Sequence, residues 1–166
     1  MEASRAIKLY GTEEPVEPPR TLKAGILEAR LEGGNLRYIT IGGVEAIRAI
    51  AFLARDRNWG TYGARIDDLE VQEGTDGFRV TYRATCEGGG ERLVYNAEIE
   101  GRPDGSLTFS AEGMPETDFV TNRTGFVVLH PLAGVVDHAV TVEHTDGRVE
   151  QSRFPLQINP ACPFED

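Results

Sequence analysis

Glycine-containing turn pairs recur along this sequence at short intervals, and they constrain its fold more than any other feature. They are the Asp-Gly pairs 76–77, 104–105 and 146–147 and the Gly-Gly pairs 33–34, 42–43 and 88–89. An Asp-Gly pair between two alternating segments favours a type I′ β-turn, because that turn requires positive φ at both central positions. The repeated turns therefore predict a series of β-hairpins and, with them, antiparallel sheets.

The segments between these turns alternate between apolar and polar residues, as strands with one buried face do. In residues 77–86, for example, Phe78, Val80 and Tyr82 share one face of the strand. Similar alternation occurs in residues 27–31, 36–41, 92–100, 107–110, 140–144 and 148–154. One-faced strands are buried when two sheets pack together, so we predict an all-β fold, an antiparallel two-sheet β-sandwich.

The chain divides into a short leader and one domain. Residues 11–20 combine prolines with glutamates, which disfavours a helix or a central strand there. We therefore expect an extended N-terminal leader over residues 1–21 and a β-sandwich domain over residues 22–166. A total of 166 residues is the usual size of one domain.

Residues 44–55 are ambiguous between helix and strand. Ile47, Ile50, Ala51 and Ala54 recur at helical spacing, and alanine favours a helix. As a strand, the segment would be apolar on both faces and buried in the sheet. Periodicity alone favours the helix, whereas the family resemblance described below favours the strand, which is the structure we expect.

Charge and hydropathy exclude several classes of partner. The formal net charge is −10, from 27 acidic and 17 basic residues, which repels a phosphate backbone and argues against a nucleic-acid partner. No run of 18 uncharged apolar residues is present, so we expect no membrane partner. The first residues lack the basic and apolar regions of a secretory signal, and we expect a cytoplasmic location.

Motifs of self-contained catalysis are missing. The sequence has no GxSxG, P-loop or GxGxxG motif, so we expect no cofactor and cannot assign catalytic residues. The histidines are His130, His138 and His144. His138 and His144 would be about 20 Å apart on one strand, too far to share an ion, and we expect no metal site.

The first polar-aromatic cluster spans residues 55–63. It contains Arg55, Trp59 and Tyr62, and Trp59 is the single tryptophan of the chain. An aromatic face beside a guanidinium group suits a sugar, which has apolar C–H faces and hydroxyl edges. The alternative is that Trp59 closes the end of the sandwich core.

The second cluster spans residues 121–131. We expect Asn122 and Arg123 to precede a strand on which Phe126, Val128 and His130 share one face. Amide, guanidinium and imidazole groups at a strand end can bind hydroxyls or a carboxylate. They can equally cap the strand end against a neighbouring domain, and the sequence leaves both possibilities open.

The two clusters also carry a family resemblance. The segments in question are GGNLRYITIGGVEAIRAIAFLARDRNWGTY, DGSLTFSAEG, TDFVTNRTGFVVLHPLAG, VTVEHTDGRVEQSRFP and INPACPFED. Their order resembles the N-terminal β-sandwich domain of D-apionate lactonase-like proteins, bacterial enzymes of apiose and sugar-acid catabolism. The resemblance covers about residues 22–166, and RDRNWGTY and TNRTGFVVLHP are its most specific blocks. A looser pattern, GGxLRxIxxGGxExIR, is similar to galactose mutarotase-like sandwiches.

The resemblance implies the N-terminal part of a longer lactone hydrolase, whose downstream barrel domain supplies most of the active site. The isolated chain would then be an accessory domain, inactive alone, with a sugar-acid lactone or carbohydrate and the barrel as its partners. We expect the substrate-binding or domain-interface residues to be Arg55, Trp59, Tyr62, Asn122, Arg123, His130 and His144.

Two other functions remain open. An aldose-epimerase-like enzyme would need a base and an acid facing one cleft, and the candidates are His130 or His144 with Glu143. A carbohydrate-binding or structural module would use Trp59 and Tyr62 as its platform.

Overall fold

The computed structural model describes residues 4–13 and 18–157, which form one short helix and eleven strands. The elements are α1 (Arg5–Tyr10), β1 (Arg20–Ala24), β2 (Leu27–Glu32), β3 (Asn35–Ile41), β4 (Val44–Asp56), β5 (Ala64–Gly74), β6 (Gly77–Gly88), β7 (Glu91–Gly101), β8 (Leu107–Pro115), β9 (Thr121–Leu129), β10 (Ala139–Glu143) and β11 (Val149–Arg153). No helix in these residues is long and apolar enough to cross a membrane.

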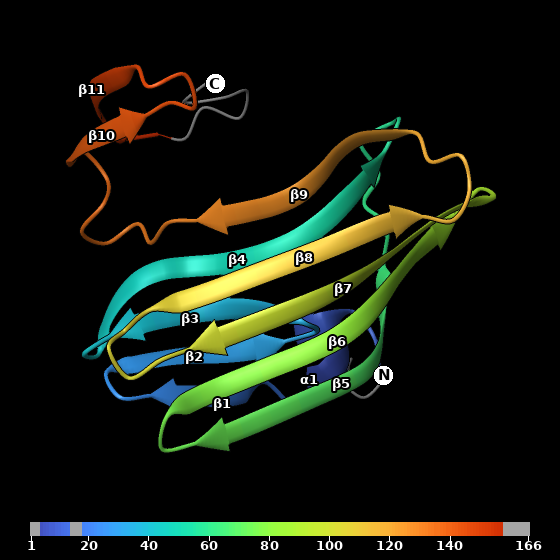
Figure 1. Cartoon of the computed structure of the whole chain (residues 1–166), viewed down its shortest axis with the longest axis horizontal. Helices are drawn as coiled ribbons and strands as arrows, with labels where there is room; N and C mark the ends of the chain where they lie inside the picture. Colours follow the sequence, from blue (N-terminus) through green and yellow to red (C-terminus); the bar gives the residue numbers. More distant parts are fainter. Residues whose placement is uncertain (1–3, 14–17, 158–166) are drawn as a thin grey trace.

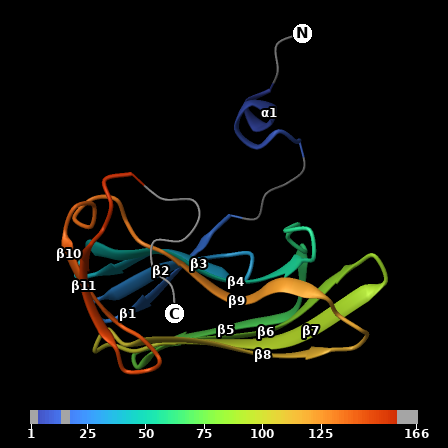
Figure 2. The same ribbon diagram turned by 90° about the horizontal axis from the view of Figure 1, so that it is seen from above.

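The strands form two layers and an additional hairpin (Figure 1). Sheet A has the order β1-β2-β3-β4-β9, and sheet B has the order β5-β6-β7-β8. β10 and β11 pair only with each other. All pairings are antiparallel. Figure 2 shows the two sheets stacked face to face, with the β10–β11 hairpin at one end. The predicted all-β antiparallel sandwich is confirmed.

The glycine pairs lie at the predicted turns. Asp76-Gly77 joins β5 to β6, Asp104-Gly105 joins β7 to β8, and Asp146-Gly147 joins β10 to β11. The glycine of each pair has positive φ, which is 117° at Gly77, 91° at Gly105 and 83° at Gly147. The aspartates before them do not have positive φ, so the type I′ turn expected for the Asp-Gly pairs is wrong although the turns lie where predicted. Each turn therefore uses a backbone conformation that glycine adopts without steric cost.

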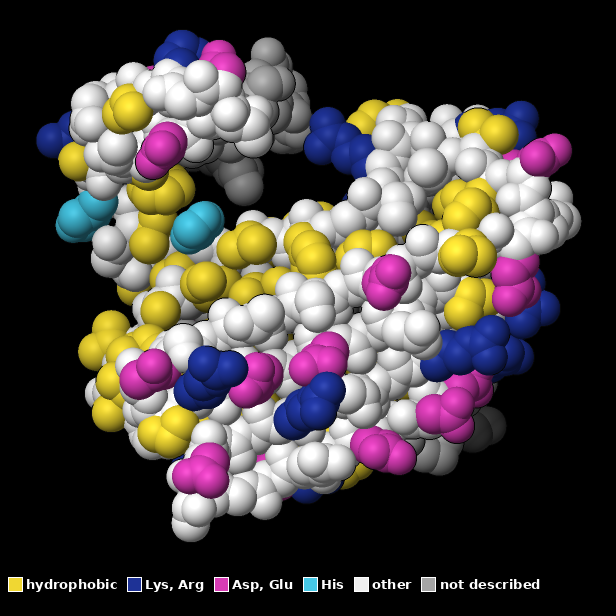
Figure 3. Space-filling view, in the orientation of Figure 1, with side chains coloured by type: hydrophobic (Ala, Val, Ile, Leu, Met, Phe, Trp, Pro, Cys, Tyr) yellow, Lys and Arg dark blue, Asp and Glu magenta, His cyan; other side chains and the backbone are white. Residues whose placement is uncertain are grey.

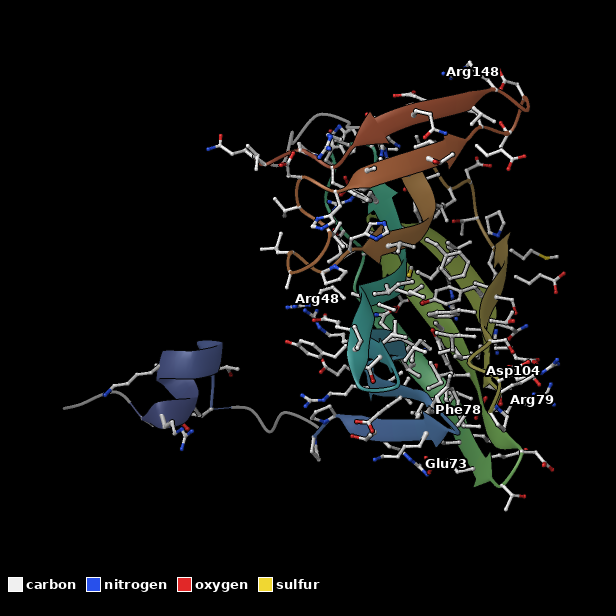
Figure 4. The ribbon with its side chains drawn as sticks, turned by 90° about the vertical axis from the view of Figure 1, so that its left-hand side faces the viewer. Arg48, Glu73, Phe78, Arg79, Asp104 and Arg148 are labelled. Carbon is white, nitrogen blue, oxygen red and sulfur yellow. The ribbon has the colours of Figure 1, made fainter. Side chains whose placement is uncertain are left out.

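The hydrophobic core lies between the inner faces of the two sheets. On β6, Phe78 points between the sheets whereas the next residue, Arg79, lies outside (Figure 4). A hydrogen bond also joins the layers inside the core, because the buried Tyr82 hydroxyl donates to the carbonyl oxygen of Gly34 at 2.8 Å. The large apolar residues of the core are Leu22, Leu27, Leu31, Leu36, Ile39, Phe78, Val80, Tyr82, Leu93, Tyr95 and Ile99.

The ambiguous segment is strand β4, which confirms the strand favoured by the family resemblance. β4 lies inside sheet A and pairs with both β3 and β9. Its Phe52 and Ala54 join the core. Backbone pairing on both edges and burial of apolar side chains outweigh the helical propensity of the alanines, which is at most a few tenths of a kcal/mol per residue.

The leader differs from the extended segment expected over residues 1–21. Residues 5–10 form α1, whose first turn is capped by the Ser4 side chain, which accepts a hydrogen bond from the Ile7 amide at 3.2 Å. Gly11, with φ 75°, ends the helix in the left-handed conformation. At the other end of the leader, β1 begins at Arg20, so sheet A starts slightly before the predicted domain boundary.

The sandwich is open along one side. β8 and β9 follow each other in the chain, but β8 ends sheet B and β9 ends sheet A, and the two strands are not hydrogen-bonded to each other. Phe126 of β9 meets Phe109 of β8 with their ring centroids 5.0 Å apart. On the same face of β9, Phe126 and Val128 remain exposed.

Candidate functional site

The two clusters singled out from the sequence meet at one end of the β4–β9 pair. In the antiparallel register Arg55 lies opposite Arg123, and Asp56 lies opposite Thr121. The Thr121 hydroxyl lies 2.8 Å from the carbonyl oxygen of Arg55. Asn122 and Arg123 therefore belong to β9 itself, whereas the sequence pattern placed them before the strand.

A tight loop follows β4 and is organised by Asp56. The Asp56 carboxylate accepts hydrogen bonds from the amides of Asn58 at 2.7 Å and Gly60 at 2.9 Å. The Asp56 amide in turn donates to the carbonyl oxygen of Gly60 at 2.8 Å. Within this loop Trp59 has φ 69°, a conformation that is uncommon for a bulky side chain. The loop holds Trp59 in a strained but well-defined position.

Trp59 and two arginines form the Arg55–Trp59–Arg123 cluster. The Trp59 side chain is 53% exposed. The Arg123 guanidinium carbon lies 5.3 Å from the centre of the indole ring, a cation–π distance. Arg55 donates to the carbonyl oxygen of Trp59 at 3.0 Å. Among the residues that the structure describes, no carboxylate forms a salt bridge with Arg55 or Arg123. The cluster thus combines an aromatic surface with two guanidinium groups suited to a carboxylate.

Asn122 is exposed beside this cluster. Its side chain makes no hydrogen bond within residues 4–13 and 18–157. Its neighbours Thr121 and Thr124 share a hydroxyl–hydroxyl hydrogen bond of 2.8 Å, which orders the start of β9. Asn122 therefore lies next to the Arg55–Trp59–Arg123 cluster without being part of its contacts.

Tyr62 belongs to a separate, acidic cleft. Its hydroxyl donates to the Glu91 carboxylate at 2.7 Å, and Arg57 donates to the other oxygen at 2.9 Å. The hydrogen bond to Glu91, together with burial, raises the pKa of Tyr62 to about 12. The hydrogen bonds from Tyr62 and Arg57 lower the pKa of Glu91. The Tyr62 ring packs on Phe119 with ring centroids 5.2 Å apart. Neighbouring side chains therefore hold both the hydroxyl and the ring of Tyr62.

The cleft next to Tyr62 has a volume of about 450 Å³. Its lining includes three carboxylates, those of Asp56, Glu87 and Glu91, against the single guanidinium of Arg57. This excess of negative charge disfavours an anionic ligand. A sugar acid is therefore better matched by the Arg55–Trp59–Arg123 cluster than by the cleft.

His130 and His144 lie at the opposite end of β9 from this cluster. Arg123 and His130 are seven positions apart in the extended chain of β9 and the residue after it, a distance of roughly 23 Å. The His130 ring packs on Phe154, after β11, with centroids 5.2 Å apart. His144 is 5% exposed, and its Nε2 lies 3.5 Å from a carboxylate oxygen of Glu150. The structure therefore divides the seven candidate residues into three groups. Four lie at one end of the β4–β9 pair, namely Arg55, Trp59, Asn122 and Arg123. Tyr62 lies in its own cleft, and His130 and His144 lie at the other end.

In the part of the chain that the structure describes, Glu143 and His144, one acid–base pair considered for an epimerase, do not face the same side. Glu143 is exposed on β10, while the next residue, His144, is buried. Within residues 4–13 and 18–157, no group of three or more His, Cys, Asp or Glu side chains is placed to hold a metal ion. Cys86 is buried, and burial raises the pKa of its thiol, which disfavours a nucleophilic thiolate. Cys162 lies outside the described residues.

An exposed apolar surface covers the C-terminal half of β9 and was missed by the sequence analysis. Phe126, Val127, Val128 and Leu129 are consecutive in β9, and all four are exposed. Figure 3 shows hydrophobic side chains in a band between β9 and β8, below the β10–β11 hairpin. The sequence does contain a signal for this surface, the run Phe-Val-Val-Leu at residues 126–129, because four consecutive apolar residues put apolar side chains on both faces of a strand.

Comparison with known proteins gives one consistent family. Residues 7–166 match the family described as the N-terminal domain of D-apionate lactonase. The chain is also 47% identical over 159 residues to a D-apionate lactonase of Brucella anthropi. That alignment covers 95% of this chain but 26% of the relative, so the chain spans about a quarter of the relative's length. No solved structure matches the chain significantly.

Proposed function

Because this chain belongs to the family of D-apionate lactonase N-terminal domains, we propose that it is the accessory domain of a sugar-acid lactone hydrolase and is inactive alone. The observation that carries this proposal is the 47% identity to a protein of which the chain spans only 26%. The downstream barrel expected from the resemblance would supply the catalytic groups.

The chemistry of lactone hydrolysis supports an accessory role. Attack on the lactone carbonyl needs an activated water or nucleophile, a general base near it, and donors for the developing oxyanion. In the described part of the chain, His130 packs on Phe154, and His144 is buried beside Glu150. Both imidazoles are therefore held against other side chains of this domain, which supports an accessory role.

The experiment that tests this proposal compares two proteins on D-apionolactone. One is this 166-residue chain. The other is the parent protein, meaning the longer polypeptide of the family that carries this domain at its N-terminus. We expect hydrolysis by the parent alone, with the short chain at the uncatalysed rate, measured by the proton released. Turnover by the short chain would contradict the accessory role, and His130→Ala and Arg123→Ala would then locate its site. Inactivity of both proteins would contradict the lactone substrate.

A second candidate function, binding of the sugar acid itself, is favoured by the Arg55–Trp59–Arg123 cluster. The exposed indole can stack on an apolar sugar face, and the two guanidinium groups can pair with a carboxylate. Asn122, on the same end of β9, can donate to a hydroxyl. In this role the domain would hold the product or substrate near the catalytic groups of the parent.

Trp59 provides a direct measurement of such binding, because it is the single tryptophan of the chain. We expect D-apionate to change the tryptophan emission in a saturable way, and Arg123→Ala to weaken binding by about tenfold, the loss of one charge-assisted contact. Arg79→Ala is a matched control, because Arg79 lies on the outside of sheet B and pairs with Glu98 at 2.8 Å. An unchanged emission spectrum at saturating sugar acid would exclude this second function.

We also propose a cytoplasmic location for the parent. Cys86, the cysteine that the structure describes, is a free and buried thiol. Reduced thiols are typical of proteins in a reducing compartment.

A further inference from the structure

The C-terminal half of β9, residues 126–129, is apolar on both faces, which sets it apart from β1, β5 and β8. On the inner face, Phe126 is 44% and Val128 is 46% exposed. On the outer face, Val127 is 37% and Leu129 is 46% exposed. Leu132, just beyond the strand, is 77% exposed. We refer to these five residues as the β9 surface.

The edge strands β1, β5 and β8 each have a polar face. β1, at the other edge of sheet A, buries Leu22 and Ala24 and exposes Thr21 and Lys23. β9 has no charged residue from Thr124 to Leu129, and one of its two backbone edges pairs with no strand of residues 4–13 and 18–157. A long apolar edge strand with free N–H and C=O groups pairs readily with another chain segment. β9 therefore has the properties of a strand that is covered in the working protein.

The inner part of the β9 surface continues the core. Phe126 contacts Phe52 of β4 at 5.3 Å between ring centroids, and Phe52 contacts Tyr95 of β7 at 4.6 Å. The row of rings thus runs from the buried Tyr95 to the exposed Phe126, where the sandwich is open between β8 and β9. An occupant of this side would extend an existing hydrophobic core and would not have to form a new one.

The chain leaves the described domain next to this surface. β11 leads to Phe154, whose ring packs on His130 immediately after β9. The family is defined as an N-terminal domain, and most of the matched Brucella anthropi protein lies outside the aligned part. In a longer parent, the polypeptide after this domain would be joined to it through Phe154, close to the β9 surface, and such a tether gives an effective concentration in about the millimolar range.

We propose that the β9 surface is the docking face for the part of the parent polypeptide that follows this domain. That part presents an apolar segment, which covers both faces of β9 and pairs with its free backbone edge. The inference rests on the proposed function only in requiring a longer parent protein. A second copy of the chain is a poorer occupant, because each copy has a net charge of −10 and the two would repel each other.

Hydrogen exchange followed by mass spectrometry tests the proposal on the parent and on the 166-residue chain. We expect peptides covering residues 121–130 to exchange at least about tenfold more slowly in the parent, because their free amides become paired. Peptides covering β1 serve as the internal control and should exchange alike in both proteins, because that edge of sheet A remains free. Equal exchange of β9 in the two proteins would overturn the proposal.

A substitution separates docking from folding. Val127→Asp changes a side chain that is already exposed in the isolated domain, so we expect the Tm of the short chain to shift by less than about 2 °C. In the parent, the same change buries a charge in the interface and should restore fast exchange of β9. Val44→Asp is the matched control, because Val44 is 72% exposed in the β3–β4 turn region, outside the β9 surface. Slow exchange of β9 in the Val127→Asp parent would overturn the proposal.

The remaining outcomes distinguish this proposal from the proposed function. A short chain that dimerises and protects β9 as well as the parent does would overturn the proposal, with a second copy as the occupant. Protection of β9 in a parent that does not hydrolyse the lactone would support the docking face and contradict the lactone hydrolase. Lactone hydrolysis by a parent whose β9 exchanges as fast as in the short chain would support the lactone hydrolase and overturn the docking face.

Discussion

At the scale of single residues, the same side chain can serve a ligand or the fold, and its hydrogen bonds decide between the two. Tyr62 and Trp59 lie three residues apart and looked equivalent as aromatic platform residues. The Tyr62 hydroxyl is committed to Glu91, and its ring packs on Phe119. Trp59 is more than half exposed, with Arg123 against its ring. Trp59 is therefore available to a partner, whereas Tyr62 fixes the loop to the sheet.

The Tyr62–Glu91–Arg57 group predicts a pH-dependent contribution to stability. The pKa of Glu91 is lower in the folded chain than its ordinary value of 4.5, so the contribution is present above about pH 4.5 and is lost as pH falls through the folded-state pKa. The pKa of Tyr62 is raised to about 12, so its contribution is present below pH 10 and is lost as pH rises through 12.

Glu91→Gln tests this contribution. We expect the variant to lower the Tm at pH 7 by about 3 °C, as for a partly exposed charged network, and to match the unmodified chain at low pH. Thermal unfolding followed by circular dichroism from pH 7 to pH 2 measures the effect. Glu87→Gln, in the same cleft, is the control and should change the Tm little. A Tm difference that persists undiminished to the lowest pH would contradict the assignment.

At the scale of elements, turns that look identical in sequence differ in what surrounds them. Gly77 and Gly147 both follow an aspartate, and both have positive φ. A Cβ added at Gly77 would overlap the carbonyl oxygen of Gly101 at the end of β7. A Cβ added at Gly147 would meet nothing within 4 Å. The β5–β6 turn is thus held against the neighbouring strand, whereas the β10–β11 turn is open.

This difference predicts unequal costs for the same substitution. Gly147→Ala should cost about 1 kcal/mol, the strain of a left-handed alanine, whereas Gly77→Ala should cost about 2–4 kcal/mol because a backbone overlap is added. Urea unfolding of both variants, with the slope of the transition compared to check two-state behaviour, measures the two free energies. Equal losses at the two positions would show that the contact with Gly101 relaxes without cost.

At the scale of the whole molecule, the layout of the sheets determines which surfaces remain uncovered. β9 is the last strand of sheet A, and its Phe126 and Val128 stay exposed although Phe126 meets Phe109 of β8. The same strand brings residues 121–123 beside residues 55–59 and carries His130 to the hairpin at the other end. One strand therefore connects the Arg55–Trp59–Arg123 cluster, the β9 surface and the position where the chain leaves the domain.

The amino-acid sequence alone determined most of the strands, the positions of the turns and the family, whereas β1, β5 and α1 were not among the predicted elements. Alternating side chains and glycine pairs are local signals, because side-chain direction repeats every two residues and positive φ is a property of a single residue. The strand at residues 44–56 depended on the family resemblance, since its local spacing was helical and its burial depends on two neighbouring strands. Tertiary structure alone decided that Arg123 lies against Trp59, that Tyr62 is paired with Glu91, and that β9 is exposed on both faces. These features depend on which strands become neighbours and which remain at an edge, and strand order in a sheet is set by contacts between residues far apart in the chain.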